Sequence, residues 1–351
     1  AANNTAKAIS QSELSILDFS EFINTREARR THFVGEQLFT SAIAAVTQGR
    51  QTKVGFVIGH GEHKASDTGG QWGYSKFANI LQQKDLNLQE IPLTGTNSIP
   101  ADCRMLIVAG PRTPYSRDEL AKLREFVGTG GRLFTLFNFY SLQRPTGLEN
   151  FLADYDFEIG FNQVSDSKNE QSGQGGLLLV DDLGSHPITK PILGSRLQML
   201  LPRSVGFPEA ENDVSPPGSI LAHSSDAGQA VGQIQGNKGS VEREGKIPLI
   251  AAKLHANDGQ PPARLVVAGD SLFLGNSAIE AGANRDFASL AVNWLLEREH
   301  LLAIAPRTVT EYRIDLSRAE MTSITWLLLL VLPGGTLGLG LLWWRRQMNR
   351  S

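Results

Sequence analysis

The longest uninterrupted apolar stretch of the chain lies near its C-terminal end. Residues 324–344 read ITWLLLLVLPGGTLGLGLLWW and contain no charged side chain. An α-helix rises about 1.5 Å per residue, so roughly 20 apolar residues cross the hydrocarbon layer of a bilayer. A buried core helix is the alternative, but such a helix is rarely apolar on every face over this length. The pattern therefore predicts a transmembrane helix, which we place at residues 321–344.

The residues around this stretch predict its orientation. Tryptophans lie near both ends, as is typical of the headgroup level, and a cluster of arginines follows the second end: Trp326, Trp343, Trp344, Arg345, Arg346 and Arg350. Because positive charge favours the cytoplasmic side, residues 345–351 form a predicted cytoplasmic tail and the preceding chain lies across the membrane. Small residues allow close helix contact, so a partner helix is expected at Gly334, Gly335, Gly338 and Gly340.

Upstream of the linker that leads to this helix, the pattern alternates between strands and helices. Short apolar runs predict strands at residues 53–58, 86–91, 104–109 and 132–137. Amphipathic periodicity predicts a helix at 72–83, and a Ser116–Glu119 capping box predicts the start of another. This alternation is typical of a doubly wound, mostly parallel sheet with helices on both faces, so we predict an α/β fold of the flavodoxin or amidotransferase type.

The second half of the chain is less regular. Polar, Gly- and Ser-rich residues predict exposed loops at 165–176 and 224–239. Further strands are predicted at 177–180, 196–201, 247–254 and 264–268, and a helix at 286–298. We therefore expect one α/β domain at 35–300, with a loop-rich insertion at about 160–245 and a juxtamembrane linker at 301–320.

The N-terminal residues 1–34 are predicted to form an extension that contains an edge strand at 15–22, followed by a helix at 35–46. The chain opens AANNTAKAIS, without an initiator Met. Either a signal or an earlier membrane span was removed, or these residues begin inside a longer protein.

Composition narrows the function classes. The net charge is −3 and 20% of the residues are charged, so no basic surface indicates nucleic-acid binding. Cys103 is the only cysteine, which excludes an internal disulfide and a multi-thiolate metal site. The sequence contains no Walker A motif, so ATP hydrolysis would belong to another subunit.

Three segments and the C-terminal span carry a resemblance to a known family. They are GEQLFTSAIAAVTQGRQTKVGFVIGHGEH (35–63), LIVAGPRTPYSRDELAKLREFVGTGGRL (106–133), LVVAGDSLFLGNSAIEAGANRDFASLAVNWLLERE (265–299), and the span that ends in WWRR (343–346). Together they resemble the GldG-like auxiliary subunits of ABC transporters known from bacterial gliding motility. The ectodomain is also similar to ThuA-like and class I glutamine-amidotransferase-like proteins, and to the N-terminal domain of an intraflagellar-transport protein.

This resemblance covers about residues 35–346. It implies a bacterial inner-membrane protein that crosses the bilayer once, with a periplasmic domain and a cytoplasmic C-terminus. It also implies partners among the integral membrane proteins of one complex, with a permease and an ATPase as candidates. The family usually carries a further N-terminal portion, with a membrane span and a thioredoxin-like segment, that these 351 residues do not contain.

Candidate ligand-binding residues lie on loops that follow predicted strands, where open α/β sheets bind ligands. They are His60, Glu62, His63, Arg112 and Asp270. Two histidines and a carboxylate could hold zinc, with Asp270 as a further ligand, but a tight glycine loop need not bring them together. A structural turn or a polar pocket for a sugar or peptide is the alternative, and for Asp270 a capping role. We expect no metal and no cofactor.

Catalysis of the amidotransferase type requires a cysteine at a sharp turn between strand and helix, with a histidine nearby. Cys103 instead precedes a strand, and no Gly-x-Ser-x-Gly motif replaces it. We therefore expect a non-enzymatic, membrane-anchored subunit that binds or scaffolds partners in a membrane complex, with the resemblance indicating an ABC-type system. Two alternatives stay open: a structural subunit of a secretion, respiratory or photosynthetic complex, and an amidotransferase-like or metal-dependent hydrolase.

Overall fold

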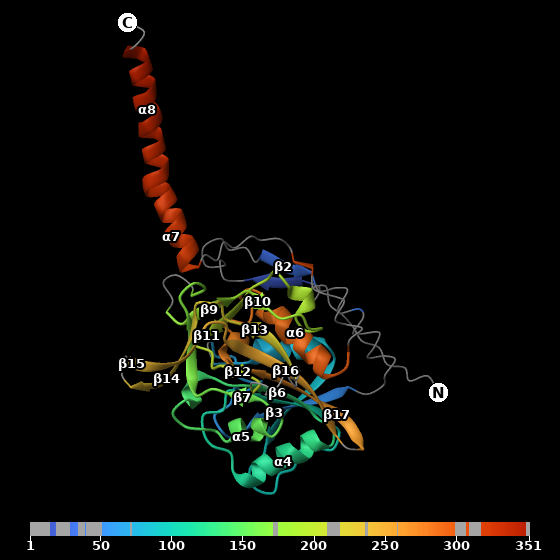
Figure 1. The fold of residues 1–351 in the computed structure, drawn as a ribbon. Helices are drawn as coiled ribbons and strands as arrows, with labels where there is room; N and C mark the ends of the chain where they lie inside the picture. The colour runs from blue at the N-terminus through green and yellow to red at the C-terminus, as the bar shows by residue number, and fades with distance from the viewer. Residues whose placement is uncertain are drawn as a thin grey trace.

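The computed structural model describes residues 15–18, 29–33, 39, 51–70, 72–170, 175–208, 218–235, 238–257, 259–298, 307–308 and 317–348. Most of these residues form one body from which a single long helix projects (Figure 1). The helix predicted at residues 35–46 lies outside the described residues, apart from residue 39.

An eight-stranded mixed sheet is the centre of the body. Its order is β10-β13-β16-β17-β6-β5-β3-β4, and the strands are β3 (Thr52–Ile58), β4 (Leu86–Pro92), β5 (Cys103–Ala109), β6 (Arg132–Leu136), β10 (Asp182–Leu183), β13 (Ser219–His223), β16 (Pro248–Asn257) and β17 (Gln260–Ala268). The five strands from β17 to β4 pair in parallel, and the other three pairs are antiparallel. The predicted α/β class with a mostly parallel sheet is confirmed.

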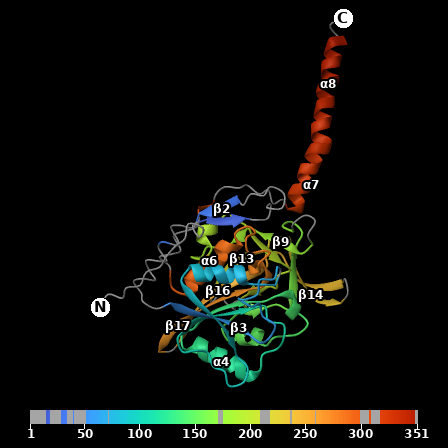
Figure 2. The same ribbon diagram turned by 180° about the vertical axis from the view of Figure 1, so that it is seen from behind.

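Helices cover both faces of this sheet because its central strands are apolar on both sides. Along β5, Met105 and Ile107 belong to one buried cluster, whereas Leu106 and Val108 belong to the other. Helices α3 (Ser75–Gln83) and α6 (Asn284–Leu295) contribute to the first cluster, and α4 (Arg117–Gly128) and α5 (Leu148–Ala153) contribute to the second. In both ribbon views α4 and α6 lie on opposite sides of the sheet (Figure 2).

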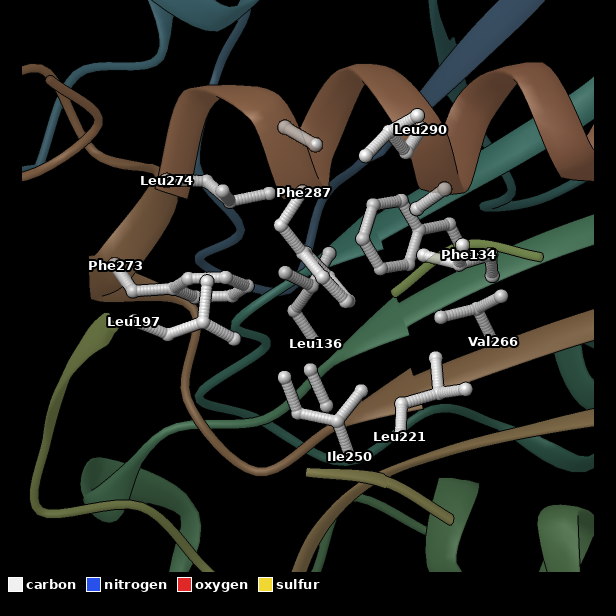
Figure 3. Close-up of a cluster of buried hydrophobic side chains, with 14 of the residues drawn as sticks. Phe134, Leu136, Leu197, Leu221, Ile250, Val266, Phe273, Leu274, Phe287 and Leu290 are labelled. Carbon is white, nitrogen blue, oxygen red and sulfur yellow. The ribbon is translucent and has the colours of Figure 1, made fainter. Parts of the chain in front are cut away.

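The inward face of α6 follows the predicted apolar stripe. Phe287 and Leu290 point from the helix toward Phe134 and Leu136 of β6 (Figure 3). Burying aromatic and aliphatic side chains of this size contributes about 1.5–3 kcal/mol each. The predicted capping box of α4 is present, because the Ser116 hydroxyl accepts a hydrogen bond from the Glu119 amide and the Glu119 carboxylate accepts one from the Ser116 amide.

The predicted loop at 224–239 is wrong. Strand β14 (Gly228–Gln235) occupies half of it and pairs on one side with β15 (Lys238–Glu244) and on the other with β8 (Asn162–Asp166). Strand β8 also takes the first two residues of the predicted loop at 165–176. These strands are rich in Gly and polar residues, so they lack the apolar alternation by which strands are recognised. Backbone pairing, with Ala230 and Val164 buried, holds them in place.

Short strands complete the body. Strand β9 (Leu177–Val180) pairs with β11 (Leu197–Leu200), and β7 (Glu158–Ile159) pairs with β12 (Val205–Gly206). A separate sheet has the order β1-β2-β18, formed by β1 (Ser15–Asp18), β2 (Arg29–Phe33) and β18 (Arg307–Thr308). A strand is predicted at 15–22, and the structure describes its residues 15–18 as β1. This strand lies in one sheet with β18, which comes from the predicted juxtamembrane linker.

The C-terminal helix extends away from the body as α7 (Arg318–Trp326), a π-helical segment (Leu327–Val331) and α8 (Leu332–Met348) (Figure 1). Pro333 lacks an amide hydrogen and its ring crowds the carbonyl of residue 329, which explains the wider helical turn just before it. Residues 319–340 are long and apolar enough to cross a membrane, and none of that segment is buried against the rest of the chain. The apolar C-terminal helix predicted from the sequence is confirmed.

Candidate functional site

The predicted site residues lie at one edge of the central sheet, where parallel strands end. Residues 59–63 follow β3, residues 110–115 follow β5, residues 137–141 follow β6, and residues 269–271 follow β17. Since these four strands run in parallel, their carboxyl ends meet at the same edge. We call this region the carboxyl edge.

His60 and Glu62 form a buried cluster with groups from the next loop and helix. The imidazole of His60 stacks on Tyr115 with a centroid distance of 4.1 Å, and its Nε2 lies 3.3 Å from Glu119 Oε2. The Glu62 carboxylate accepts hydrogen bonds from the Tyr115 hydroxyl and, at 2.6 Å, from the His60 amide.

The charges of this cluster serve local structure. Burial, followed by the nearby charge of Glu62, raises the pKa of Tyr115 well above its usual value, so the phenol stays protonated and donates. Burial opposes ionisation of Glu119, but hydrogen bonds from Ser116 outweigh it and lower the pKa of that carboxyl group. Both carboxylates therefore have protein partners: Glu62 fixes the loop and Glu119 caps α4.

His63 lies between two aromatic rings. Its ring stacks on Tyr74 at 4.5 Å and on Trp72 at 5.8 Å, while Nδ1 lies 2.7 Å from the Trp72 carbonyl oxygen and Nε2 lies 2.9 Å from Ser271 Oγ. Burial lowers the pKa of His63 to about 4, so the ring is neutral near pH 7. Because a carbonyl oxygen only accepts, Nδ1 carries the proton and Nε2 accepts from the Ser271 hydroxyl.

The Ser271–His63 contact has the arrangement of a nucleophile and its base. However, Ser271 is 0% exposed and His63 is also buried. A methyl group on Gly110, whose φ is +66°, would lie 2.5 Å from Ser271 Oγ and 2.9 Å from His63 Nε2. The pair is thus closely packed beneath the loop after β5, and a substrate carbonyl has no room beside the hydroxyl.

Asp270 is fully buried and its carboxylate bonds to the backbone. Oδ2 accepts from the Leu200 amide at 2.8 Å, and Oδ1 accepts from the Leu272 amide at 2.7 Å. Burial raises the pKa of Asp270 to about 7, and these backbone hydrogen bonds act in the opposite direction. The carboxylate joins β11 to the start of the 3₁₀ turn η3 (Leu272–Leu274), in which Ser271 is at the N-cap position.

Arg112 is partly exposed and is held by aromatic rings. Its guanidinium carbon lies 4.4 Å from the centroid of the Trp72 ring and 5.0 Å from that of Tyr140. Over the part of the chain that the structure describes, the guanidinium makes no hydrogen bond or ion pair, and its Nε is buried without a partner. Tyr140 is 46% exposed, so this part of the carboxyl edge is open to its surroundings.

The five predicted residues thus do not form one pocket. His60 and Glu62 belong to one buried cluster, His63 and Asp270 lie in the packed interior around Ser271, and Arg112 lies at the surface. In the described ranges, no group of three His, Cys, Asp or Glu side chains could hold a metal ion. Sequence reasoning missed Trp72, Tyr140, Tyr115 and Ser271 as neighbours of this site. Ser271 follows Asp270 just after the end of β17, and this position could have indicated from the sequence that it belongs to the same edge.

The four glycines of the C-terminal helix face open space. Apart from the adjacent backbone of the helix itself, no heavy atom of the described residues lies within 4 Å of a Cβ added at Gly334, Gly335, Gly338 or Gly340. At about 100° per residue, the first three lie on one side of α8, whereas Gly340 lies on a different side. At the start of this helix, Glu320 is 3.2 Å from Arg196 of the body.

One family model matches most of the chain. Its description is "ABC-type uncharacterized transport system", and the match covers residues 51–293, which includes the central sheet and the whole carboxyl edge. No curated protein sequence matches the chain.

Several solved structures are similar to the chain. The "mmIFT52 N-terminal domain" is 13% identical, covers 69% of this chain and 96% of its own, and has a TM-score of 0.50. A putative ThuA-like protein from Parabacteroides merdae is 12% identical, covers 76% of this chain and 95% of its own, with a TM-score of 0.41. A second one from Bacteroides uniformis is 11% identical, covers 69% and 90%, with a TM-score of 0.40.

Proposed function

Because the chain belongs to the family of auxiliary proteins described as "ABC-type uncharacterized transport system", we propose that it is a non-catalytic, membrane-anchored subunit of such a system. The observation that carries this proposal is the C-terminal helix: residues 319–340 are apolar, and none of the segment is buried by the chain itself. A domain of this family joined to such a helix is suited to contact neighbouring membrane proteins.

The proposed orientation places the body in the periplasm and the tail in the cytoplasm. It rests on the arginines that follow the helix, Arg345 and Arg346 among them, because cytoplasmic ends of spans carry excess positive charge. The proposed membrane is therefore the bacterial inner membrane, crossed once by this helix.

Two surfaces are proposed to make the contacts. Within the membrane, Gly334, Gly335 and Gly338 present a small-residue side that allows another helix to approach closely. Outside it, the carboxyl edge presents Arg112 beside the rings of Trp72 and Tyr140. His60, Glu62, His63 and Asp270 support this edge from within, because their polar atoms bond to other parts of the chain.

A non-catalytic role is supported by the packing of the Ser271–His63 pair. The geometry of a nucleophile and base is present, but Ser271 is 0% exposed and Gly110 lies directly against it. A hydrolase would need an exposed nucleophile with donors for the developing oxyanion.

Purification of the full chain in a mild detergent, with identification of the proteins that accompany it, tests the proposal. We expect an ATPase and a polytopic permease to be recovered together with the chain. A Gly334→Leu/Gly338→Leu variant should recover less of both, and a Leu337→Ala variant serves as the matched control on the same helix. Recovery of respiratory, photosynthetic or secretion subunits in place of an ATPase and a permease would refute the proposal.

A further inference from the structure

Arg112 differs from three other arginines of the body in how its charge is balanced. Arg124 pairs with Asp154 at 2.7 Å, Arg203 with Glu149 at 2.9 Å, and Arg132 with Glu297 at 2.8 Å. The Arg112 guanidinium has no such carboxylate within the described ranges, and two aromatic rings contact it instead. A partly buried cation is thus held in place without a carboxylate partner, and its Nε is buried without a hydrogen bond.

The chemistry of the guanidinium matches a particular kind of ligand. A guanidinium has its N–H groups in one plane, where they match the two oxygens of a carboxylate or phosphate. Because Trp72 and Tyr140 already restrict the side chain, little conformational entropy remains to be lost on binding. Arg112 therefore has the features of a preorganised anion subsite.

The surrounding charges favour a singly charged anion. His63 is neutral near pH 7, because burial lowers its pKa to about 4, and it adds no second positive charge. Doubly charged phosphate is usually bound by several cations or by a nest of backbone amides. A single guanidinium is better matched to the single charge of a carboxylate.

The open shape of the subsite favours a segment of a larger partner. Small-molecule sites usually bury most of the ligand surface, whereas Tyr140 is 46% exposed here. Trp, Tyr and Arg are the residues that contribute most strongly to protein–protein binding. The two rings also offer apolar contact to the methylene groups that precede a side-chain carboxylate.

We propose that the carboxyl edge binds an acidic peptide segment of a partner protein, with a carboxylate of that segment held by Arg112 beside Trp72 and Tyr140. This inference deepens the proposed function, on which it rests, by assigning the chemistry of the partner.

Fluorescence anisotropy on the full chain in detergent micelles tests the inference. The probe is a labelled, end-capped peptide of four glutamates flanked by glycines, and its counterpart contains four glutamines. We expect the glutamate peptide to bind at least tenfold more tightly than the glutamine peptide, and Arg112→Gln to weaken its binding at least tenfold. Arg124→Gln, which removes the same charge from α4, should bind as the unchanged chain does.

Three results would overturn the inference. They are absence of binding by the glutamate peptide, equal binding by the Arg112→Gln and Arg124→Gln variants, and displacement of the peptide by inorganic phosphate at a lower concentration than by acetate. The last result would assign the subsite to phosphate. If the peptide does not bind, the expected co-purification of an ATPase and a permease is unaffected. If the peptide binds but the ATPase and the permease are not recovered, the proposed function alone is contradicted.

Discussion

Two regions of the carboxyl edge differ in how their polar groups are used. In the interior, the side chains of His63, Ser271 and Asp270 are buried. The His63 ring bonds to the Trp72 carbonyl oxygen and to the Ser271 hydroxyl, and the Asp270 carboxylate accepts hydrogen bonds from two backbone amides. At the exposed rim of the carboxyl edge, which we define by Arg112, Trp72 and Tyr140, the Arg112 guanidinium contacts the two aromatic rings and makes no ion pair in the described part of the chain. We therefore propose that the interior serves folding and the rim serves binding, although all these residues follow parallel strands and look alike in the sequence.

The largest expected effect is on the interior. Asp270→Ala removes the acceptor of the Leu200 and Leu272 amides and leaves buried donors without partners, so it should lower the free energy of unfolding by about 3–5 kcal/mol. Chemical denaturation of the full chain in detergent measures this. Asp226→Ala, at an exposed position, is the control and should change the value by less than about 0.5 kcal/mol. A loss below about 1 kcal/mol for Asp270→Ala would place this carboxylate outside the structural interior.

A second expected effect concerns pH. Because burial lowers the pKa of His63 from 6.5 to about 4, the unfolded chain binds its proton more readily, and stability is lost as pH falls from about 6.5 to 4. A His63→Gln variant lacks this loss, so the stability difference between the two proteins should change by up to about 3 kcal/mol across that range. His186 and Asp270 also titrate with shifted pKa values, but they are common to both proteins. Parallel stability curves would contradict a buried, neutral His63.

The general fold could be predicted from the sequence because the apolar pattern of the central strands is strong. The strand from Cys103 to Ala109 is apolar on both faces, and the stripe of α6 includes Phe287, Leu290 and Trp294 at helical spacing. The match to the ABC-type auxiliary family confirms the resemblance seen in the sequence motifs. The polar strands β14 and β15 could not be predicted, since backbone pairing rather than apolar alternation holds them.

The site could be predicted only as a set of strand ends. His60, Glu62 and Arg112 were found because they follow β3 and β5, but sequence spacing does not tell which side chain turns inward. Trp72 and Tyr140 come from other loops, and their contact with Arg112 depends on the tertiary arrangement of the edge. Asp270 is fully buried whereas Arg112 is partly exposed, and this difference depends on the packing of the whole fold.

Arg112→Gln gives the most direct test that the rim serves binding and not folding. We would measure both the free energy of unfolding of the full chain and the amount of ATPase and permease that it recovers in mild detergent. The account predicts a stability within about 0.5 kcal/mol of the unchanged chain and a clear loss of recovered partners. A destabilised variant, or a stable variant that recovers its partners in full, would contradict it.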